Sequence, residues 1–541
     1  MSAEARAAEA PPAPWELTLL LVVAACAVLP DLYDVDAFKT ATVALLAGVL
    51  LLPRLLLSGT DELRAWFGSA GGRLHLLAAA LAVPAAAQAL HHAGTIDRLL
   101  GTVLAATAAM LGLRAAAAGL SFTRAMQGAT LLVAVVALLQ SVGLLGALTA
   151  PGSDGQPEIV ATLANTTRAG ALLALGVCAA FAQLLAPDAR ESVGRERLAA
   201  ATLNLGVAAL LLTRARGAWL AAAVGLVALA WVSRATLAAR WRSWLVPLLV
   251  GVVLGGFLGD GRRLLQPKVE IGGPLLSTGD VTAEVRFSVW RGTLRLVQEH
   301  PLLGIGLGRF REAFPPYREP GEARLPGREG LPTEVDHPHD ELLLAFAEGG
   351  VPAGLCLLGF LLLTLRRAAA RATGAAGAFG EPPADGGLSD RAAFGVLIAG
   401  TVTGLVQNSW TAPGTALPFF AAAGWVWRPA LAPEPTAGGR RLARGLLVLL
   451  IAGTLVLAVP RMQTQAQWYR FFRDADSKGV NLQNFGWLTQ AADASPGDID
   501  VQARLVHFAD AIGNAVPDTA AMVLPAKERA LLRIDELRAA R

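Results

Sequence analysis

The sequence predicts an all-α fold, namely a polytopic helical bundle embedded in a membrane. Of its 541 residues, 54% are hydrophobic and 16% are charged, and the mean hydropathy is +0.49. Soluble globular proteins carry about 25% charged residues, so this composition excludes an ordinary soluble domain. The apolar residues also form blocks of about twenty, the length that a helix needs to cross about 30 Å of hydrocarbon.

Thirteen apolar blocks are candidate membrane spans, and they define a membrane-embedded domain over residues 1–460. The blocks cover residues 15–30, 39–57, 74–90, 99–117, 125–148, 168–186, 198–213, 217–233, 243–259, 341–365, 392–408, 414–428 and 445–460. A large hydrophilic loop, residues 260–340, separates the ninth block from the tenth. A hydrophilic tail covers residues 461–541, and its helical spacing over 481–513 predicts a small helical appendage that packs on the loop.

Arginines alternate along the connections between the blocks. One set of connections holds Arg54, Arg64, Arg73, Arg114, Arg124, Arg190, Arg195, Arg197, Arg234, Arg240, Arg242, Arg366, Arg367, Arg371, Arg428, Arg440, Arg441 and Arg444. The other set includes 30–38, 91–97, 150–165 and 407–415, which contain no Lys or Arg. By the positive-inside rule the first set is cytoplasmic. The N-terminus is then inside, and an odd number of spans places the C-terminus, the loop 260–340 and the tail outside.

The outward position of the loop and tail limits the chemistry that they can perform. ATP and nucleotide sugars are cytoplasmic, so most phosphoryl transfer and sugar-nucleotide chemistry is excluded there. The sequence has no basic n-region, which argues against a cleaved signal peptide. The three cysteines lie inside apolar blocks without metal-ligand spacing or a disulfide framework. We expect a lipid bilayer as the environment and no nucleic-acid partner.

The stretch TRARGAW places Arg214 and Arg216 on the outer side, against the charge pattern just described. One interpretation is that both snorkel to the membrane interface beside Trp219. The other is that a guanidinium grips a diphosphate at the outer surface, which arginine can do with two parallel hydrogen bonds. Because the two arginines are two residues apart, a helix would point them in nearly opposite directions, and one is expected to face the site.

Within the outer loop, residues 281–299 have the spacing of an amphipathic helix, with Val285, Val289 and Leu296 on one side. Arg286 and Trp290 are four residues apart and share a face. An alternative is a helix that lies on the membrane with solvated basic residues. The following GIGLG, residues 304–308, predicts tight turns rather than a dinucleotide site, because no strand–helix unit follows it.

The loop ends in VDHPHDE, which contains His337 and His339. A His-x-His pair can bind zinc, but the only further ligands nearby, Asp336, Asp340 and Glu341, crowd the same few residues, so no metal site is expected. A histidine at this position suits the role of a general base that takes a proton from a substrate hydroxyl.

Two acidic residues follow the histidines. Asp340 could cap the tenth span by accepting hydrogen bonds from its first free amides. Glu348 lies well inside the apolar run, and a carboxylate within a membrane span is a functional candidate. Gly349, Gly350 and Pro352 are expected to disturb the helix at this point.

Together these stretches resemble the O-antigen ligase and polymerase superfamily of bacterial envelope enzymes. The resemblance rests on TRARGAWLA, RFSVWRGTLRLVQEHPLLGIGLGRF and HPHDELLLAFAEGGVPAGL in that order, and on ATLANTTRAGALLAL, whose Asn165 matches an Asn-containing start of a span. It implies that Arg216 and Arg286 bind the diphosphate of an undecaprenyl-linked glycan. It also implies that His339 is the base acting on the acceptor hydroxyl, assisted by His337. The sequence departs from the family at Asp340, where the family has Asn.

The resemblance implies a membrane glycosyltransferase of the inner membrane that needs no metal or cofactor. The leading hypothesis is a ligase that moves a polysaccharide from undecaprenyl diphosphate to the lipid A-core of lipopolysaccharide. The same chemistry would serve a polymerase with a glycan acceptor or a protein O-oligosaccharyltransferase. A secondary transporter is the remaining alternative, but the sequence lacks paired repeats with broken helices, and its unusual polar residues gather at one surface.

Overall fold

The structure is a computed structural model. It describes residues 15–26, 35–53, 56, 61–75, 77, 93–117, 122–145, 150–151, 157–163, 165–185, 193–259, 281–323, 335–374, 388–407, 409–428, 437–478, 481–515 and 520–539.

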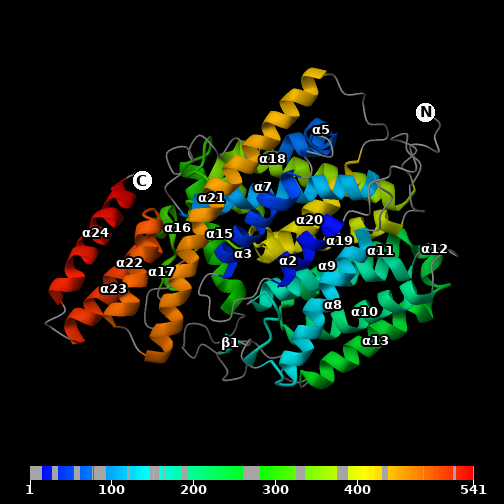
Figure 1. Ribbon diagram of the computed structural model, residues 1–541. Coiled ribbons are helices and arrows are strands. Elements are labelled where there is room, and N and C mark those ends of the chain that lie inside the picture. Colours follow the sequence, from blue (N-terminus) through cyan, green and yellow to red (C-terminus); the bar gives the residue numbers. More distant parts are fainter. Residues whose placement is uncertain are drawn as a thin grey trace.

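The described chain is almost entirely helical (Figure 1), which confirms the all-α class. The first half contains α2 (Trp15–Cys26), α3 (Val35–Leu46), the π-helical η1 (Ala47–Leu51), α5 (Asp61–Gly68), α7 (Ala93–Ala117), α8 (Phe122–Ser141), α9 (Thr166–Leu184), α10 (Val193–Leu212), α11 (Arg216–Val232), α12 (Arg234–Leu237) and α13 (Trp241–Leu258). The second half contains α15 (Val281–Glu299), α16 (Phe310–Ala313), η3 (Pro315–Tyr317), α17 (Pro320–Ala323), α18 (Glu341–Ala372), α19 (Leu388–Gln407), η6 (Ser409–Thr411), α20 (Pro413–Val426), α21 (Ala437–Lys478), α22 (Leu482–Ala494), α23 (Ile499–Ala515) and α24 (Ala520–Ala539). Two strands of two residues, β1 (Ala150–Pro151) and β2 (Pro157–Glu158), pair antiparallel.

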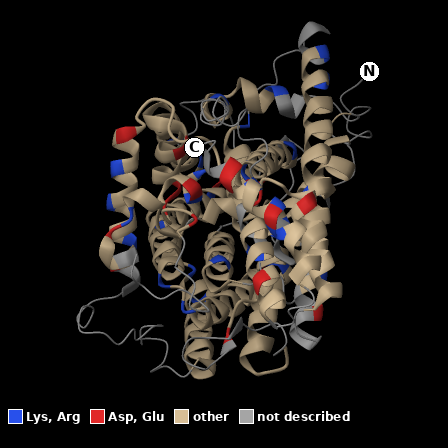
Figure 2. Ribbon diagram, turned by 90° about the vertical axis from the view of Figure 1, so that its left-hand side faces the viewer, with Lys and Arg blue, Asp and Glu red and all other residues tan. Residues whose placement is uncertain are grey.

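Six of the predicted apolar blocks coincide with helices that could cross a membrane by length and composition. Among the described residues, six helices are long and apolar enough to cross a membrane, namely Gly94–Ala116, Phe122–Ser141, Thr166–Leu184, Trp241–Leu258, Glu341–Ala372 and Arg441–Trp468. Two shorter apolar helices cover Lys39–Leu51 and Arg216–Val232. The predicted span 74–90 lies mostly outside the described residues, and the total of thirteen stays a prediction. Figure 2 shows long stretches of helix that carry no charged residue.

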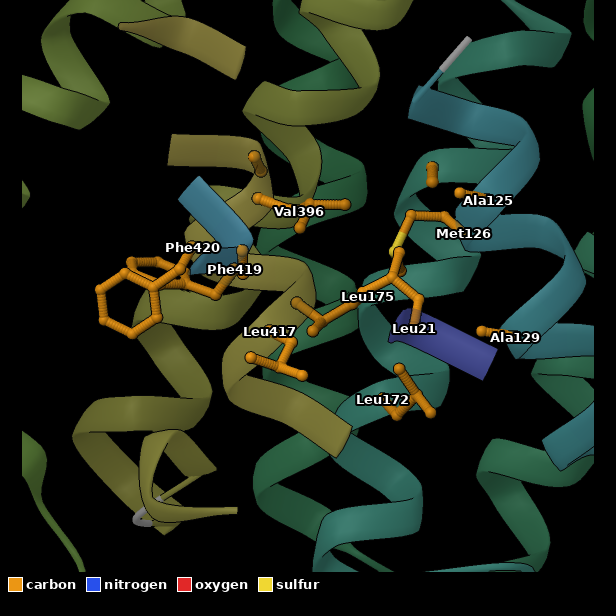
Figure 3. Packing of buried hydrophobic residues seen from close by; sticks show 14 of the residues in the cluster. Leu21, Ala125, Met126, Ala129, Leu172, Leu175, Val396, Leu417, Phe419 and Phe420 are labelled. Carbon is orange, nitrogen blue, oxygen red and sulfur yellow. The ribbon is translucent and has the colours of Figure 1, made fainter. Parts of the chain in front are cut away.

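The bundle has a buried centre and an apolar periphery. Figure 3 shows Leu172 and Leu175 of α9, Val396 of α19 and Leu417 of α20 packed together with residues of α2 and α8. At the periphery, α13 leaves Val253 70% and Phe257 82% exposed, and α21 leaves Val456 70% exposed. Exposed apolar faces of this extent suit contact with lipid rather than with water.

Small residues allow close packing between the inner helices. A methyl group added at Gly112 of α7 would overlap the carbonyl of Ala421, and one at Gly424 of α20 would overlap the carbonyl of Ala109. Helices within membranes gain little from hydrophobic burial against each other, so van der Waals contact between backbones stabilises their association. The α7–α20 pair is packed in this way.

The described helix ends fall into two groups. At one end, α18 begins beside His339, and we call this end of the bundle the histidine end. The C-terminus of α19 lies close to the N-terminus of α11 there, because Gln407 is next to Gly217. At the opposite end, Arg428 after α20 forms a bidentate ion pair with Asp390 of α19, with N–O distances of 2.7 and 2.8 Å. Arg367 and Arg371 of α18 donate to the carbonyl of Arg428. These three arginines belong to the set that the charge pattern groups together.

Helix α18 is kinked at Gly350, where the backbone has φ 71° and ψ −175°. The whole helix would be about 48 Å long at 1.5 Å per residue, more than the hydrocarbon thickness requires. The kink separates a first segment of nine residues, which carries Glu341 and Glu348, from a second that ends near Arg371. The helix is therefore disturbed at Gly350, within the stretch for which the sequence predicts a disturbance.

The tail forms its own small core. Helices α22, α23 and α24 pack against the end of α21, with Trp468, Phe471, Phe485 and Leu505 buried among them. In Figure 1 these helices lie at the left together with α15 to α17, whereas α12 lies at the right-hand edge. The described tail is helical, as predicted, and its core includes residues from the extension of α21 beyond the apolar block. That the tail packs on the loop 260–340 stays a prediction.

Candidate functional site

The outer helix α15 is the platform of the site. Its buried face, Val289 and Leu296, packs on Phe310 and Phe314, and the same cluster includes Leu344 of α18. Val285 is partly buried against the cluster, so the face predicted for this amphipathic helix is confirmed. The packing fixes α15 against the first turn of α18.

Trp290 attaches α15 to the segment that carries the two histidines. Its indole Nε1 donates to the carbonyl oxygen of Pro338 at 2.8 Å. The next residue, His339, has a left-handed backbone with φ 57°. Non-glycine residues rarely adopt this conformation, and it persists only where surrounding contacts hold it.

Asp340 is the N-cap of α18, as the sequence predicts. Its Oδ1 accepts from the amides of Leu342 at 2.8 Å and Leu343 at 2.9 Å. Burial raises the pKa of this carboxyl, and the two amide hydrogen bonds partly oppose that effect. Where the family has Asn, the acid here supplies the same capping acceptor, so the departure preserves the local geometry.

The two imidazoles contact each other edge to face, with their ring centroids 4.5 Å apart. Loss of water around His339, together with the positive charges of Arg286 and Arg168, lowers its pKa to about 4. Burial, His339 and Arg168 lower the pKa of His337 well below its usual value, and Arg98 acts in the same direction. Both rings are therefore neutral near pH 7 and can accept a proton. The Nδ1 of His337 is buried without a hydrogen-bond partner among the described residues.

The two arginines that lower the pKa of His339 come from different elements. Arg286 is half-buried on α15, four residues before Trp290. Arg168 lies in the first turn of α9, which is capped by Asn165; the Asn165 side chain accepts from the amides of Thr167 at 2.8 Å and Arg168 at 3.2 Å. The structure thus brings Arg286 and the histidines together, as predicted, and adds Arg168. Asn165 acts as a cap there, and its role in substrate binding stays a prediction.

Arg214 and Arg216 lie beside the start of α9. A methyl group added at Gly170 of α9 would lie 2.8 Å from Cβ of Ala215 and 3.0 Å from Cβ of Ala218, so the two helix starts are in direct contact. Arg214 is half-buried in the tight turn with φ 54°, and Arg216 is the exposed first residue of α11. The turn brings both arginines to the histidine end. That these arginines bind the substrate stays a prediction.

Glu348 lies on α18, nine residues after His339, and is 3% exposed. Its Oε2 accepts from Arg98 Nη2 of α7 at 3.2 Å, and its Oε1 accepts from the amide of Gly308 at 2.9 Å. The glycines of GIGLG all have positive φ, which confirms the predicted tight turns, and this loop rests on the kink of α18. A substrate-binding role for Glu348 stays a prediction.

Sequence reasoning missed Arg98 and Arg168. Arg168 is part of TTRAGALLAL, and Arg98 directly follows a connection that is free of basic residues, so each lies at the edge of an apolar block. An arginine at the outer edge of a block is the same signal that singled out Arg216. Among the described residues, no three His, Cys, Asp or Glu side chains form a group that could hold a metal ion.

Comparison with known families gives one match. Residues 201–358 match the family model described as O-antigen ligase. The matched region runs from α10 to the middle of α18. It includes the turn with Arg214 and Arg216, helix α15 and both histidines. Comparison with curated proteins gives no match. Residues 201–358 are thus similar to the O-antigen ligase family, and this finding supports the resemblance of the chain to the O-antigen ligase and polymerase superfamily.

Proposed function

We propose that the protein is a metal-independent glycosyltransferase that moves a glycan from undecaprenyl diphosphate to an acceptor hydroxyl on the periplasmic face of the bacterial inner membrane. The observation that carries the proposal is the position of His339, which contacts His337 and lies in the field of Arg286 and Arg168 at the start of an apolar helix. A neutral base beside two guanidinium groups suits a reaction in which a hydroxyl attacks and a diphosphate leaves.

The reaction needs one bond to form and one to break. The acceptor oxygen forms a bond to the anomeric carbon of the donor glycan, and the bond from that carbon to the diphosphate oxygen breaks. His339 takes the proton of the acceptor hydroxyl, and the polyprenyl diphosphate leaves with the bonding electron pair. The diphosphate is already activated, so no nucleotide is consumed at this step.

Each group of the site has a place in this scheme. Arg286 and Arg216 bind the diphosphate oxygens, for which the planar guanidinium provides paired donors. Arg168 adds further positive charge near His339. The buried Nδ1 of His337 can form a hydrogen bond with the acceptor substrate or with a water molecule. This suits a residue that assists His339.

The acceptor that we propose is the lipid A-core, which makes the protein an O-antigen ligase. The test uses purified protein in lipid nanodiscs, an undecaprenyl-diphosphate-linked glycan, and three separate acceptors: lipid A-core, a second lipid-linked glycan, and an acceptor protein. Glycan attached to lipid A-core is the expected product. Product on the second lipid-linked glycan would identify a polymerase, and product on protein an O-oligosaccharyltransferase. No product with any acceptor, together with transport of the donor across the membrane, would contradict the proposal.

A further inference from the structure

Two adjacent residues at the start of α7, Asp97 and Arg98, bind two different parts of the protein. Arg98 points to α18, where its Nη2 lies 3.2 Å from Glu348 Oε2 and its Nη1 lies 3.8 Å from Glu341 Oε2. Asp97 binds Arg461 of α21 through both oxygens, at 3.1 and 2.8 Å. Neither residue lies within the region that matches the O-antigen ligase family.

On the α18 side, Arg98 completes a cluster that holds the histidine segment. Glu341 is 3% exposed, directly follows Asp340 in the sequence, and accepts from the amides of Trp410 at 2.7 Å and Thr411 at 3.1 Å. Glu348, seven residues later in the same segment, accepts from the amide of Gly308. A cation shared by the two buried carboxylates stabilises their charged forms, because a buried charge without a partner is strongly destabilising. Arg98 provides that cation for both.

The first turn of α7 also holds the GIGLG loop. Thr95 Oγ1 donates to the carbonyl of Leu307 at 2.7 Å, and the backbones of Gly94 and Gly308 approach so closely that a Cβ on either would overlap the other. The amides of Ile305 and Gly306 donate to the carbonyls of Ala347 and Glu348 at 2.9 Å each. The start of α7, the loop and the first segment of α18 therefore form one packed unit.

On the other side, Arg461 connects this unit to the C-terminal helices. Arg461 is 4% exposed, and its Nη1 donates to Asp498 Oδ2 at 2.6 Å. Asp498 lies in the turn between α22 and α23 and accepts from the amide of Val501 at 3.3 Å. The guanidinium of Arg461 thus connects Asp498 of the tail to Asp97, the neighbour of Arg98.

We propose that Arg98 is a positioning residue that holds His337 and His339 in place, and that the C-terminal helices support it through the Asp498–Arg461–Asp97 bridge. The proposal rests on the proposed function for its kinetic consequences. It gives the tail a role in transfer that does not require a tail residue to contact the reacting atoms.

The first test is Arg98→Gln with Arg291→Gln as the matched control. Arg291 of α15 forms an exposed ion pair with Glu319 at 2.8 Å, within the outer loop. Arg98→Gln should lower kcat for transfer about 10- to 100-fold, as expected when reacting groups shift by about 1 Å, with little change in the donor KM because Arg286 and Arg216 are untouched. Arg291→Gln should keep the wild-type kcat.

Two further variants keep the test informative if Arg98→Gln folds poorly. Arg98→Lys retains the charge but cannot reach both carboxylates with paired donors, so it should recover part of the lost kcat. The double variant with Arg98→Gln and Glu348→Gln removes both members of the pair and should be no slower than Arg98→Gln alone, because the two residues act as one unit. Losses that multiply would show that they act independently, and would overturn the positioning role.

The tail is tested with Arg461→Gln against Arg533→Gln. Arg533 forms an ion pair with Asp493 at 3.1 Å within the tail and leaves the bridge to α7 intact. Arg461→Gln should lower kcat, and combining it with Arg98→Gln should add little further loss. A wild-type kcat for Arg461→Gln would overturn the role of the tail.

A readout that does not need transfer separates this proposal from the proposed function. Diethyl pyrocarbonate modifies accessible neutral imidazoles, and the exposed His300 at the end of α15 serves as an internal reference. Mass spectrometry should show faster modification of His337 and His339, relative to His300, in Arg98→Gln and Arg461→Gln than in the wild type. If the wild-type protein transfers no glycan and this increase is present, the function is wrong and the positioning stands. An unchanged ratio in both variants would overturn the positioning role.

Discussion

At the residue scale, His339 combines two properties that a base does not ordinarily need. Its backbone is left-handed, and its pKa is lowered to about 4 by loss of water and by Arg286 and Arg168. A base with this pKa is neutral at pH 7 but weak. A bound diphosphate would offset the two arginines, and the pKa of the imidazole would then rise toward the value at which a general base is most effective. Substrate binding and activation of the base are linked in this way.

The pH dependence of transfer follows from this linkage. For kcat/KM, which reports the free enzyme, the acid limb should lie near pH 4, and for kcat, which reports the complex, it should lie at higher pH. Initial rates between about pH 3 and pH 8 in nanodiscs would measure both limbs. The same group affects stability: its folded pKa is below the unfolded value of about 6.5, so stability is lost as the pH falls from about 6.5 toward 4. Acid limbs of kcat/KM and kcat at the same pH would contradict the link between substrate binding and the pKa of His339.

Arg286 and Arg291 lie on the same helix and provide a matched comparison. Arg286→Lys keeps the charge but loses the paired donors, so transfer should fall about 100-fold, the loss typical of removing one well-placed stabilising group. Arg291 is 64% exposed and pairs with Glu319, so Arg291→Lys should behave as the wild type.

Arg216→Lys should resemble Arg286→Lys, and His339→Ala should abolish transfer in folded protein. Full activity in both arginine variants would show that these residues only anchor the protein at the membrane interface.

A chelation experiment tests whether the histidine pair acts without a metal. The described residues place no third ligand with the pair, so transfer should continue at the wild-type rate in excess EDTA. Rates with and without EDTA in the same preparation provide the comparison. Loss of activity that zinc or magnesium restores would make the histidines metal ligands and remove their role as bases.

At the element scale, the kink of α18 sets the position of the GIGLG loop. Gly350 has a conformation open only to glycine, and a Cβ there would lie 2.6 Å from the backbone of Leu302. Gly350→Ala should therefore cost about 1–3 kcal/mol of stability from the backbone alone and should impair transfer as well. Gly374→Ala is the control, because Gly374 also has positive φ but would place its Cβ in open space. Thermal unfolding and transfer assays should show a larger loss at Gly350; equal losses would mean that the contact with Leu302 contributes nothing.

The same elements show what sequence alone can predict. Apolar blocks and the spacing of Val285, Val289 and Leu296 predict helices and their buried faces, because burial follows directly from periodicity. Asp340 as a cap and the turns of GIGLG also depend only on neighbouring residues. The ion pairs of Arg98 and Arg461 join residues 250 and 364 positions apart in the chain, and no local pattern contains that information.

Arg168 marks the same limit at the site itself. Its neighbours in the sequence identify a helix start, but its charge acts on His339, 171 positions further along the chain, and no local pattern contains that relation. The tail is a similar case. A single stretch of helical spacing cannot show that Trp468 and Phe471, at the end of a membrane helix, complete the core of α22 to α24.

At the scale of the whole molecule, the described helices connect two chemically different ends. At the opposite end, Arg428 after α20 pairs with Asp390 and accepts a hydrogen bond from Arg371 of α18 at its carbonyl oxygen. The histidine end gathers the starts of α7, α9, α11 and α18 and the C-terminal helices. Since α18 begins at one end and Arg371 lies near its other end, the two ends must face different sides of any membrane that the helix crosses.

The orientation of the molecule in the membrane is therefore open to a direct test. Because basic residues are retained on the cytoplasmic side, a reporter fused at about residue 375, just beyond Arg371, should be cytoplasmic, and one fused after residue 541 should be periplasmic. Alkaline phosphatase is active only outside and green fluorescent protein folds only inside, so each position can be tested with both reporters. A third fusion after Arg428, at the same end as Arg371, should agree with the first. The same compartment for residues 375 and 541 would contradict the odd number of spans, and a reversed result would place the histidines on the cytoplasmic side, where the proposed periplasmic acceptor is absent.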